Sequence, residues 1–142
     1  MAVRCFEDLE VWRTAKDLAV RIYKVTEDGR FGRDFGLRDQ IRRAAVSVMS
    51  NVAEGFDRYS RAEFGQFLSI ARGSAAEVRS QLYLAHDLGY LADDDFKALL
   101  DLCGQVTRML SALRARANRP RANTPAPPHP RTPAPPHPRT LR

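Results

Sequence analysis

Apolar residues recur along most of the chain at alternating steps of three and four, the spacing of a helix with one buried face. In the first such segment Val11, Ala15, Leu18, Ile22 and Val25 form the stripe. Four segments show this pattern, at residues 8–27, 36–56, 60–88 and 93–113, and none shows the alternation of a strand. The pattern predicts an all-α protein.

Residues that start or stop helices lie between these segments. Asp28-Gly29 interrupts the first, Gly55 suits the end of the second, and Gly89 suits the end of the third. Ser60 and Glu63 have the spacing of a capping box, in which each side chain binds the other residue's main-chain N–H. Four helices with short connections predict an antiparallel up-down-up-down four-helix bundle.

The chemistry changes near residue 117. All nine prolines lie at or after Pro120, and the segment TPAPPHPR at 124–131 repeats at 132–139. Such proline density is incompatible with helices and sheet ladders, so we expect a disordered, extended tail. The predicted organisation is a bundle domain over 1–117 and a proline-rich basic tail over 118–142. A spacer explains the tail better than a docking motif does.

Charge is distributed unevenly. Residues 1–113 hold 16 Lys and Arg against 17 Asp and Glu, whereas residues 114–142 hold seven Arg and no acid. The net charge of +6 therefore originates in residues 114–142, the end of the bundle and the tail. Non-specific attraction of the tail to RNA or DNA and simple solvation of its charge are both open interpretations.

The cysteines and the lack of a long apolar run further narrow the class of protein. Cys5 and Cys103 are far apart and fit no metal-ligand spacing, so we expect two free thiols in a reducing cytoplasm. No run approaches the ~18 apolar residues of a membrane span, and we expect no membrane partner. We expect no metal or other cofactor.

Three segments, FEDLEVWRTAKDLAVRIY, QIRRAAVSVMSNVAEGFDR and FLSIARGSAAEVRSQL, carry a family resemblance. They resemble the four-helix bundle protein family, also called 23S rRNA intervening-sequence proteins, over roughly residues 5–113. The SNVAEG block followed by RGSAAE is its most specific part. The family commonly has proline after Ser47-Val48, where this chain has Met49.

The resemblance implies a left-handed up-down bundle that assembles as a homopentamer. Some members are encoded inside insertions in 23S rRNA genes. The family is related to the accessory variability protein of diversity-generating retroelements, which works with a reverse transcriptase and nucleic acid. A reverse transcriptase or another protein is thus a further expected partner, and the family implies no enzymatic activity.

A polar stripe lies beside the apolar one on the second and third helices. At 100° per residue its members on the second helix share an arc of about 80°. The stripe comprises Arg43, Ser47, Asn51, Glu54, Arg58, Glu63, Ser74 and Glu77. A structural network of Arg–Glu pairs and Asn hydrogen bonds between helices or subunits is the favoured interpretation. A ligand or nucleic-acid site is the alternative.

Arginines gather at two places and are candidate nucleic-acid contacts, because guanidinium groups bind phosphate bidentately. The candidates are Arg38, Arg42, Arg43, Arg58, Arg61, Arg114, Arg116, Arg119 and Arg121. In a ring oligomer each cluster would be repeated around the axis. Solvated charge balanced by the acids is the alternative for the bundle.

Catalytic residue sets are missing from the sequence. The only histidine before the tail is His86, and Tyr83 occupies the position where a di-metal bundle needs glutamate. A pairing of His86 with Asp87 near a helix end is expected instead. We therefore predict a non-enzymatic, self-assembling nucleic-acid-associated accessory protein. The alternative is a protein–protein scaffold or adaptor that binds no nucleic acid.

Overall fold

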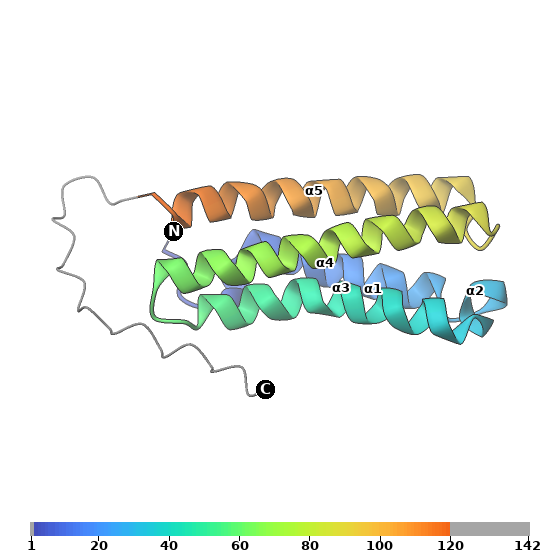
Figure 1. Cartoon of the computed structure of the whole chain (residues 1–142), viewed down its shortest axis with the longest axis horizontal. Helices are drawn as coiled ribbons and strands as arrows, with labels where there is room; N and C mark the ends of the chain where they lie inside the picture. Colours follow the sequence, from blue (N-terminus) through green and yellow to red (C-terminus); the bar gives the residue numbers. More distant parts are fainter. Residues whose placement is uncertain (1, 120–142) are drawn as a thin grey trace, which may run out of the picture.

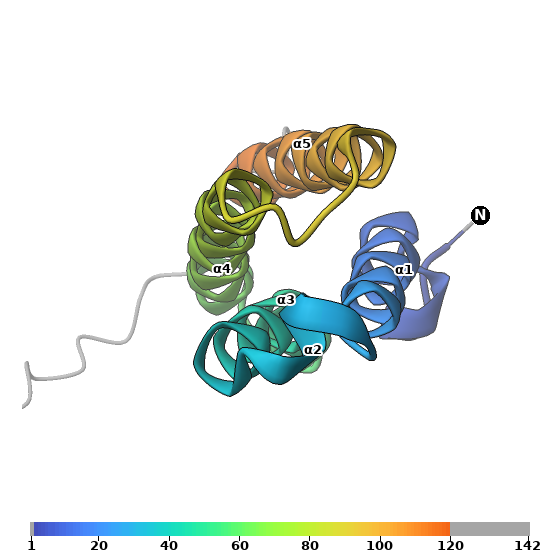
Figure 2. The ribbon, with the colours of Figure 1, turned by 90° about the vertical axis from the view of Figure 1, so that its right-hand side faces the viewer.

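The computed structural model describes residues 2–119, and no strand occurs in that range. Its long helices are α1 (Glu10–Val25), α3 (Phe35–Phe56), α4 (Arg61–Asp87) and α5 (Asp93–Ala117). They lie side by side in Figure 1, and Figure 2 shows the order α1, α3, α4, α5 around the bundle. The predicted four-helix bundle is therefore confirmed. The predicted tail lies, apart from residues 118 and 119, outside the described residues.

The four apolar stripes meet along the bundle axis. Leu18, Ile22, Ile41, Leu68 and Leu82 are fully enclosed, one or two from each of the first three long helices. Val106 and Leu110 add the stripe of α5. Each such side chain contributes roughly 1.5–3 kcal/mol when removed from water. The periodicity that predicted the helices thus also identified the faces that form the core.

Local signals set most helix ends. The Ser60 hydroxyl accepts from the Glu63 N–H at 3.1 Å and caps α4. Gly89 has φ of 74°, a left-handed conformation that side chains disfavour, and it follows the last turn of α4. The predicted end of the fourth helix at residue 113 was too early, because α5 continues to Ala117.

Two short helices were not predicted. A 3-10 turn, η1 (Phe6–Asp8), precedes α1, and α2 (Gly29–Arg33) occupies the stretch expected to be a plain connection. Phe31 of α2 is 1% exposed and packs 5.5 Å from the Tyr90 ring. Five residues are too few to show a periodic pattern, so α2 had no sequence signal of this kind.

Gly55 has a different role from the one predicted. It lies inside the last turn of α3 with no positive φ, so it does not act as a helix-ending glycine. A Cβ there would lie 2.5 Å from the Cβ of Phe67 on α4. Gly55 therefore allows α3 and α4 to approach each other closely.

His86 contacts a closer carboxylate in addition to the expected one. Its Nε2 lies 2.7 Å from Asp93 Oδ1 across the α4–α5 turn, whereas Asp87 is 3.9 Å from the ring. The His86 ring also stacks on Phe96, with centroids 4.1 Å apart. These contacts join the end of α4 to the start of α5.

The hydrogen bond between His86 and Asp93 makes the free energy of unfolding depend on pH in the acidic range. The hydrogen bond with His86 holds the pKa of the Asp93 carboxyl below its usual range. A lowered folded-state pKa stabilises the protein above the unfolded pKa of about 4, and this effect is lost as pH falls through the folded-state pKa. Asp93→Asn should therefore lower the urea midpoint at pH 6 and differ progressively less from the native chain below pH about 4.

Asp94→Asn provides the control, because Asp94 is an exposed neighbour in the same first turn. It removes the same charge from the helix N-terminus but no contact with His86. A difference between the two variants that persists undiminished in acid would contradict the assignment.

Both cysteines are unpaired thiols, Cys5 exposed and Cys103 buried between helices. Burial raises the pKa of the Cys103 thiol to about 12. Within residues 2–119, no helix combines the length and apolarity needed to cross a membrane.

Candidate nucleic-acid interface

Three members of the predicted polar stripe meet between α3 and α4. The hydroxyls of Ser47 and Ser74 lie 2.8 Å apart and link the two helices. The Asn51 amide donates to the Ser47 carbonyl at 2.8 Å and to its hydroxyl at 3.0 Å. These half-buried groups satisfy one another, as polar groups at a helix interface must.

The charged members of the stripe are placed differently. Arg58 pairs with Glu54 at 2.9 Å one turn away, and Arg43 donates to the Asp39 carbonyl of its own helix at 3.4 Å. Glu77 accepts from Gln81 at 3.3 Å. In the part of the chain that the structure describes, no Arg–Glu pair joins two helices. Within a single chain the stripe joins α3 to α4 through the Ser47 and Ser74 hydroxyls, and Asn51 supports Ser47 from within α3.

Two arginines of the first predicted cluster are engaged inside the molecule. Arg42 Nε donates to the Thr26 hydroxyl at 2.8 Å, and its guanidinium lies 4.4 Å from the Tyr23 ring centroid. Arg38 donates to the Gly32 carbonyl at 3.1 Å. These contacts connect α3 to the end of α1 and to α2, which gives both side chains a structural role.

The second predicted cluster lies at the C-terminal end of α5. Arg114, Arg116 and Arg119 are exposed there, and Arg61 at the start of α4 donates to the Arg119 carbonyl at 3.4 Å. The fold thus joins Arg61 to residues more than fifty positions away. Arg121 lies outside the described residues.

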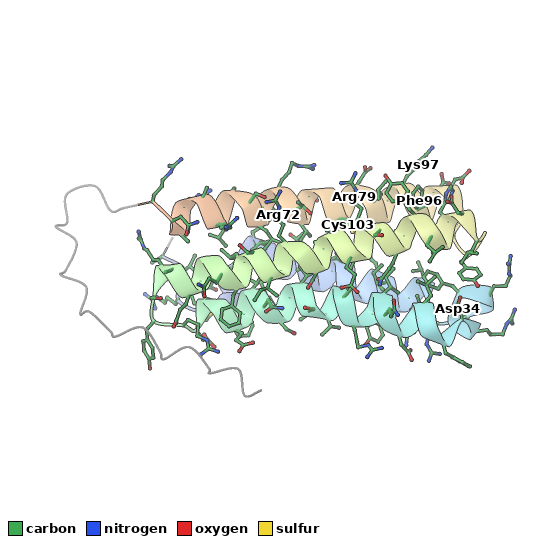
Figure 3. The ribbon with its side chains drawn as sticks, viewed as in Figure 1. Asp34, Arg72, Arg79, Phe96, Lys97 and Cys103 are labelled. Carbon is green, nitrogen blue, oxygen red and sulfur yellow. The ribbon has the colours of Figure 1, made fainter. Side chains whose placement is uncertain are left out.

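Sequence reasoning missed three further arginines of this region. Arg72 and Arg79 extend from α4 toward α5 in Figure 3, and Arg108 belongs to α5. Arg79 is near enough to Cys103 of α5 for its charge to act on that thiol. A helical projection could have found the α4 set, because positions 61, 72 and 79 share one face.

Together these residues form what we call the α4–α5 basic face. It comprises Arg61, Arg72, Arg79, Arg108, Arg114 and Arg119, whereas Arg116 lies on the other side of α5, next to Glu10 and Val11 of α1. No carboxylate lies within 4.0 Å of these guanidinium groups among residues 2–119. Among the other described arginines, Arg21, Arg38 and Arg58 pair with an acid, whereas Arg13, Arg30, Arg33, Arg42 and Arg43 have no such pair, so the α4–α5 basic face is distinguished by how closely its arginines gather. A near-neutral bundle therefore carries a locally positive face.

Within residues 2–119, no group of three His, Cys, Asp or Glu side chains could hold a metal ion. His86 is hydrogen-bonded to Asp93 and stacks on Phe96 at the N-terminal end of α5, whereas the arginines gather at its C-terminal end. The most prominent polar groups on the α4–α5 side are guanidinium groups, which are suited to binding anions.

These features define a small helical-bundle protein with a basic face on two adjacent helices. A family model described as 23S rRNA-intervening sequence protein matches residues 7–112, and the chain belongs to this family. The fold also matches a crystal structure of a protein of unknown function from the S23 ribosomal protein family of Bacteroides thetaiotaomicron VPI-5482. The TM-score is 0.70 at 24% identity, over 74% of this chain and 95% of that one. Comparison with curated proteins gives no match.

Proposed function

We propose that this protein is a non-enzymatic accessory protein that assembles into a homopentamer and associates with nucleic acid. The α4–α5 basic face is the observation that carries the proposal. Its six guanidinium groups have no acidic partner within residues 2–119, so they would be electrostatically favoured next to phosphates, and each phosphate contact releases a bound counterion. Membership of a family named for an rRNA-intervening sequence also supports the proposed association with nucleic acid.

Exposed apolar side chains support self-assembly. Ile70 and Leu84 of α4 are 53% and 50% exposed, and Val46 of α3 is 37% exposed. Burial of such side chains against further copies would be favourable at roughly 25 cal/mol per Å². Assembly would also repeat the α4–α5 basic face in every subunit and so strengthen its attraction for a polyanion.

Electrophoretic shift with structured RNA and with duplex DNA tests the proposal at two salt concentrations. We expect binding at about 50 mM salt that weakens roughly 100-fold at 200 mM, which corresponds to about four phosphate contacts. Absence of a shift with either nucleic acid at low salt would contradict nucleic-acid association.

A protein scaffold is the second candidate, favoured by the balance of 16 basic and 17 acidic residues over 1–113. Affinity capture from cell extract with and without nuclease separates the two. The nucleic-acid function predicts that captured proteins are lost after nuclease treatment, whereas scaffold partners would remain bound.

A further inference from the structure

A shallow depression of about 260 Å³ lies between α4 and the C-terminal half of α5. It is lined by Arg72, Ser111, Arg114, Ala115 and Asn118. Two guanidinium groups, a hydroxyl and an amide converge on it, and no carboxylate contributes to its lining. Several hydrogen-bond donors around a small hollow suit an oxyanion of phosphate size.

Other residues fix the walls of this depression. A Cβ at Gly65 would lie 2.8 Å from Asn118 Oδ1, so this glycine allows the end of α5 to rest against α4. Arg61 holds the following residue through the Arg119 carbonyl. The spacing of Ser111, Arg114 and Asn118 places them on one side of α5, since neighbours three and four apart share a helix face.

Helix-end electrostatics account for only part of this arrangement. Arg114 and Arg116 lie in the last turn of α5, where a cation offsets the partial negative charge of the helix end. Arg72 lies near the middle of the 27-residue α4, far from either end. It has no carboxylate within 4.0 Å among the described residues, so no ion pair in that range accounts for its placement beside Arg114.

We propose that this depression binds a phosphodiester group of a nucleic-acid backbone, held by Arg72 and Arg114 with Ser111 and Asn118 as neutral donors. The inference rests on the proposed nucleic-acid association and assigns it to a site. Arg61 and Arg79 extend the same face of α4 over 18 residues, or about 27 Å. That length corresponds to about eight nucleotides of one duplex strand.

The test uses the full chain and a fluorescently labelled structured RNA, with affinity measured by anisotropy from about 50 to 200 mM salt. Arg72→Gln/Arg114→Gln should bind at least about tenfold more weakly at low salt. It should also lower the slope of log affinity against log salt by about two, one for each phosphate contact removed.

Two controls distinguish binding at this site from attraction by the net charge of the protein. Lys24→Gln/Arg33→Gln removes the same charge from exposed residues near α2 and should change affinity less than about twofold. Ser111→Ala leaves charge unaltered and should weaken binding about fivefold without changing the salt slope. Circular dichroism melting verifies that each variant is folded.

Distinct results identify which proposal fails. Equal weakening in both double variants would show attraction by net charge alone and would overturn the site. Native-like binding by Arg72→Gln/Arg114→Gln would overturn it too, while nucleic-acid association stands. No binding by the native chain would overturn the proposed function. Inorganic phosphate should compete weakly at matched ionic strength, and competition that saturates the site at micromolar concentration would indicate a small-molecule phosphate instead.

Discussion

Gly55→Ala should lower the free energy of unfolding by about 2–3 kcal/mol, measured by urea denaturation. The added methyl would lie 2.5 Å from Phe67 Cβ and 3.1 Å from Phe64 Cδ1. The first of these atoms is fixed to the backbone of α4, so no side-chain rotation removes the clash and the helices must separate. Separation loosens the packing of Phe56 on Phe64 at the same end of the bundle.

Gly73→Ala is the matched control on the neighbouring helix. A Cβ at Gly73 meets nothing within 4 Å, and alanine favours the helix by about 1 kcal/mol. The two Gly→Ala changes should thus act in opposite directions. A Gly55→Ala protein as stable as the native chain would show that α3 and α4 do not depend on this close approach.

Arg42→Ala should lower the free energy of unfolding by about 2–3 kcal/mol, because it removes charge-assisted hydrogen bonds at the end of α1. Thr26 is fully buried, and its hydroxyl donates to the Ile22 carbonyl at 2.7 Å while accepting from Arg42. Arg42 also donates to the Thr26 carbonyl at 3.2 Å. Without the guanidinium, the last carbonyls of α1 lose partners supplied by α3.

Arg43→Ala provides the comparison, since Arg43 is exposed and its guanidinium donates a hydrogen bond to a carbonyl of its own helix. It should change stability by less than about 0.5 kcal/mol. Similar losses in both variants would contradict the capping role of Arg42. Arg42→Lys should recover only part of the loss, because one ammonium cannot reproduce the planar fork.

Features within one helix could be predicted from the sequence. Apolar spacing identified the core faces, and Ser60 and Gly89 marked helix ends because their chemistry acts on adjacent residues. Each of these signals depends on local geometry that is the same in any fold. The bundle was therefore predictable before any tertiary contact was known, and the family was recognised separately, from the resemblance of the SNVAEG and RGSAAE blocks.

Features between helices could not be predicted in this way. Arg72 and Arg114 line one depression only because α4 and α5 lie side by side. The sequence identified Arg114 as a candidate, but Arg72 looks like ordinary surface charge there. The same reason explains why the sequence indicated the adjacent Asp87 as a partner of His86 but not the closer Asp93. Gly55 was interpreted through the helix-ending habit of glycine, whereas its cause is the position of Phe67 on another helix.

Mass in solution, measured by light scattering behind a sizing column with and without an RNA pool, tests the central claim most directly. The comparison needs the native full chain and a variant with the tail arginines Arg121, Arg131, Arg139 and Arg142 changed to Gln. Both proteins keep the α4–α5 basic face, so the comparison distinguishes RNA binding by the bundle from RNA binding by the tail.

We predict about 80 kDa for both proteins, five times the 16.0 kDa of one chain, and a further gain in mass with RNA in both. RNA uptake by the native chain alone would place binding in the tail and contradict a role for the α4–α5 basic face. A single-chain mass near 16.0 kDa that RNA leaves unchanged would contradict both assembly and nucleic-acid association.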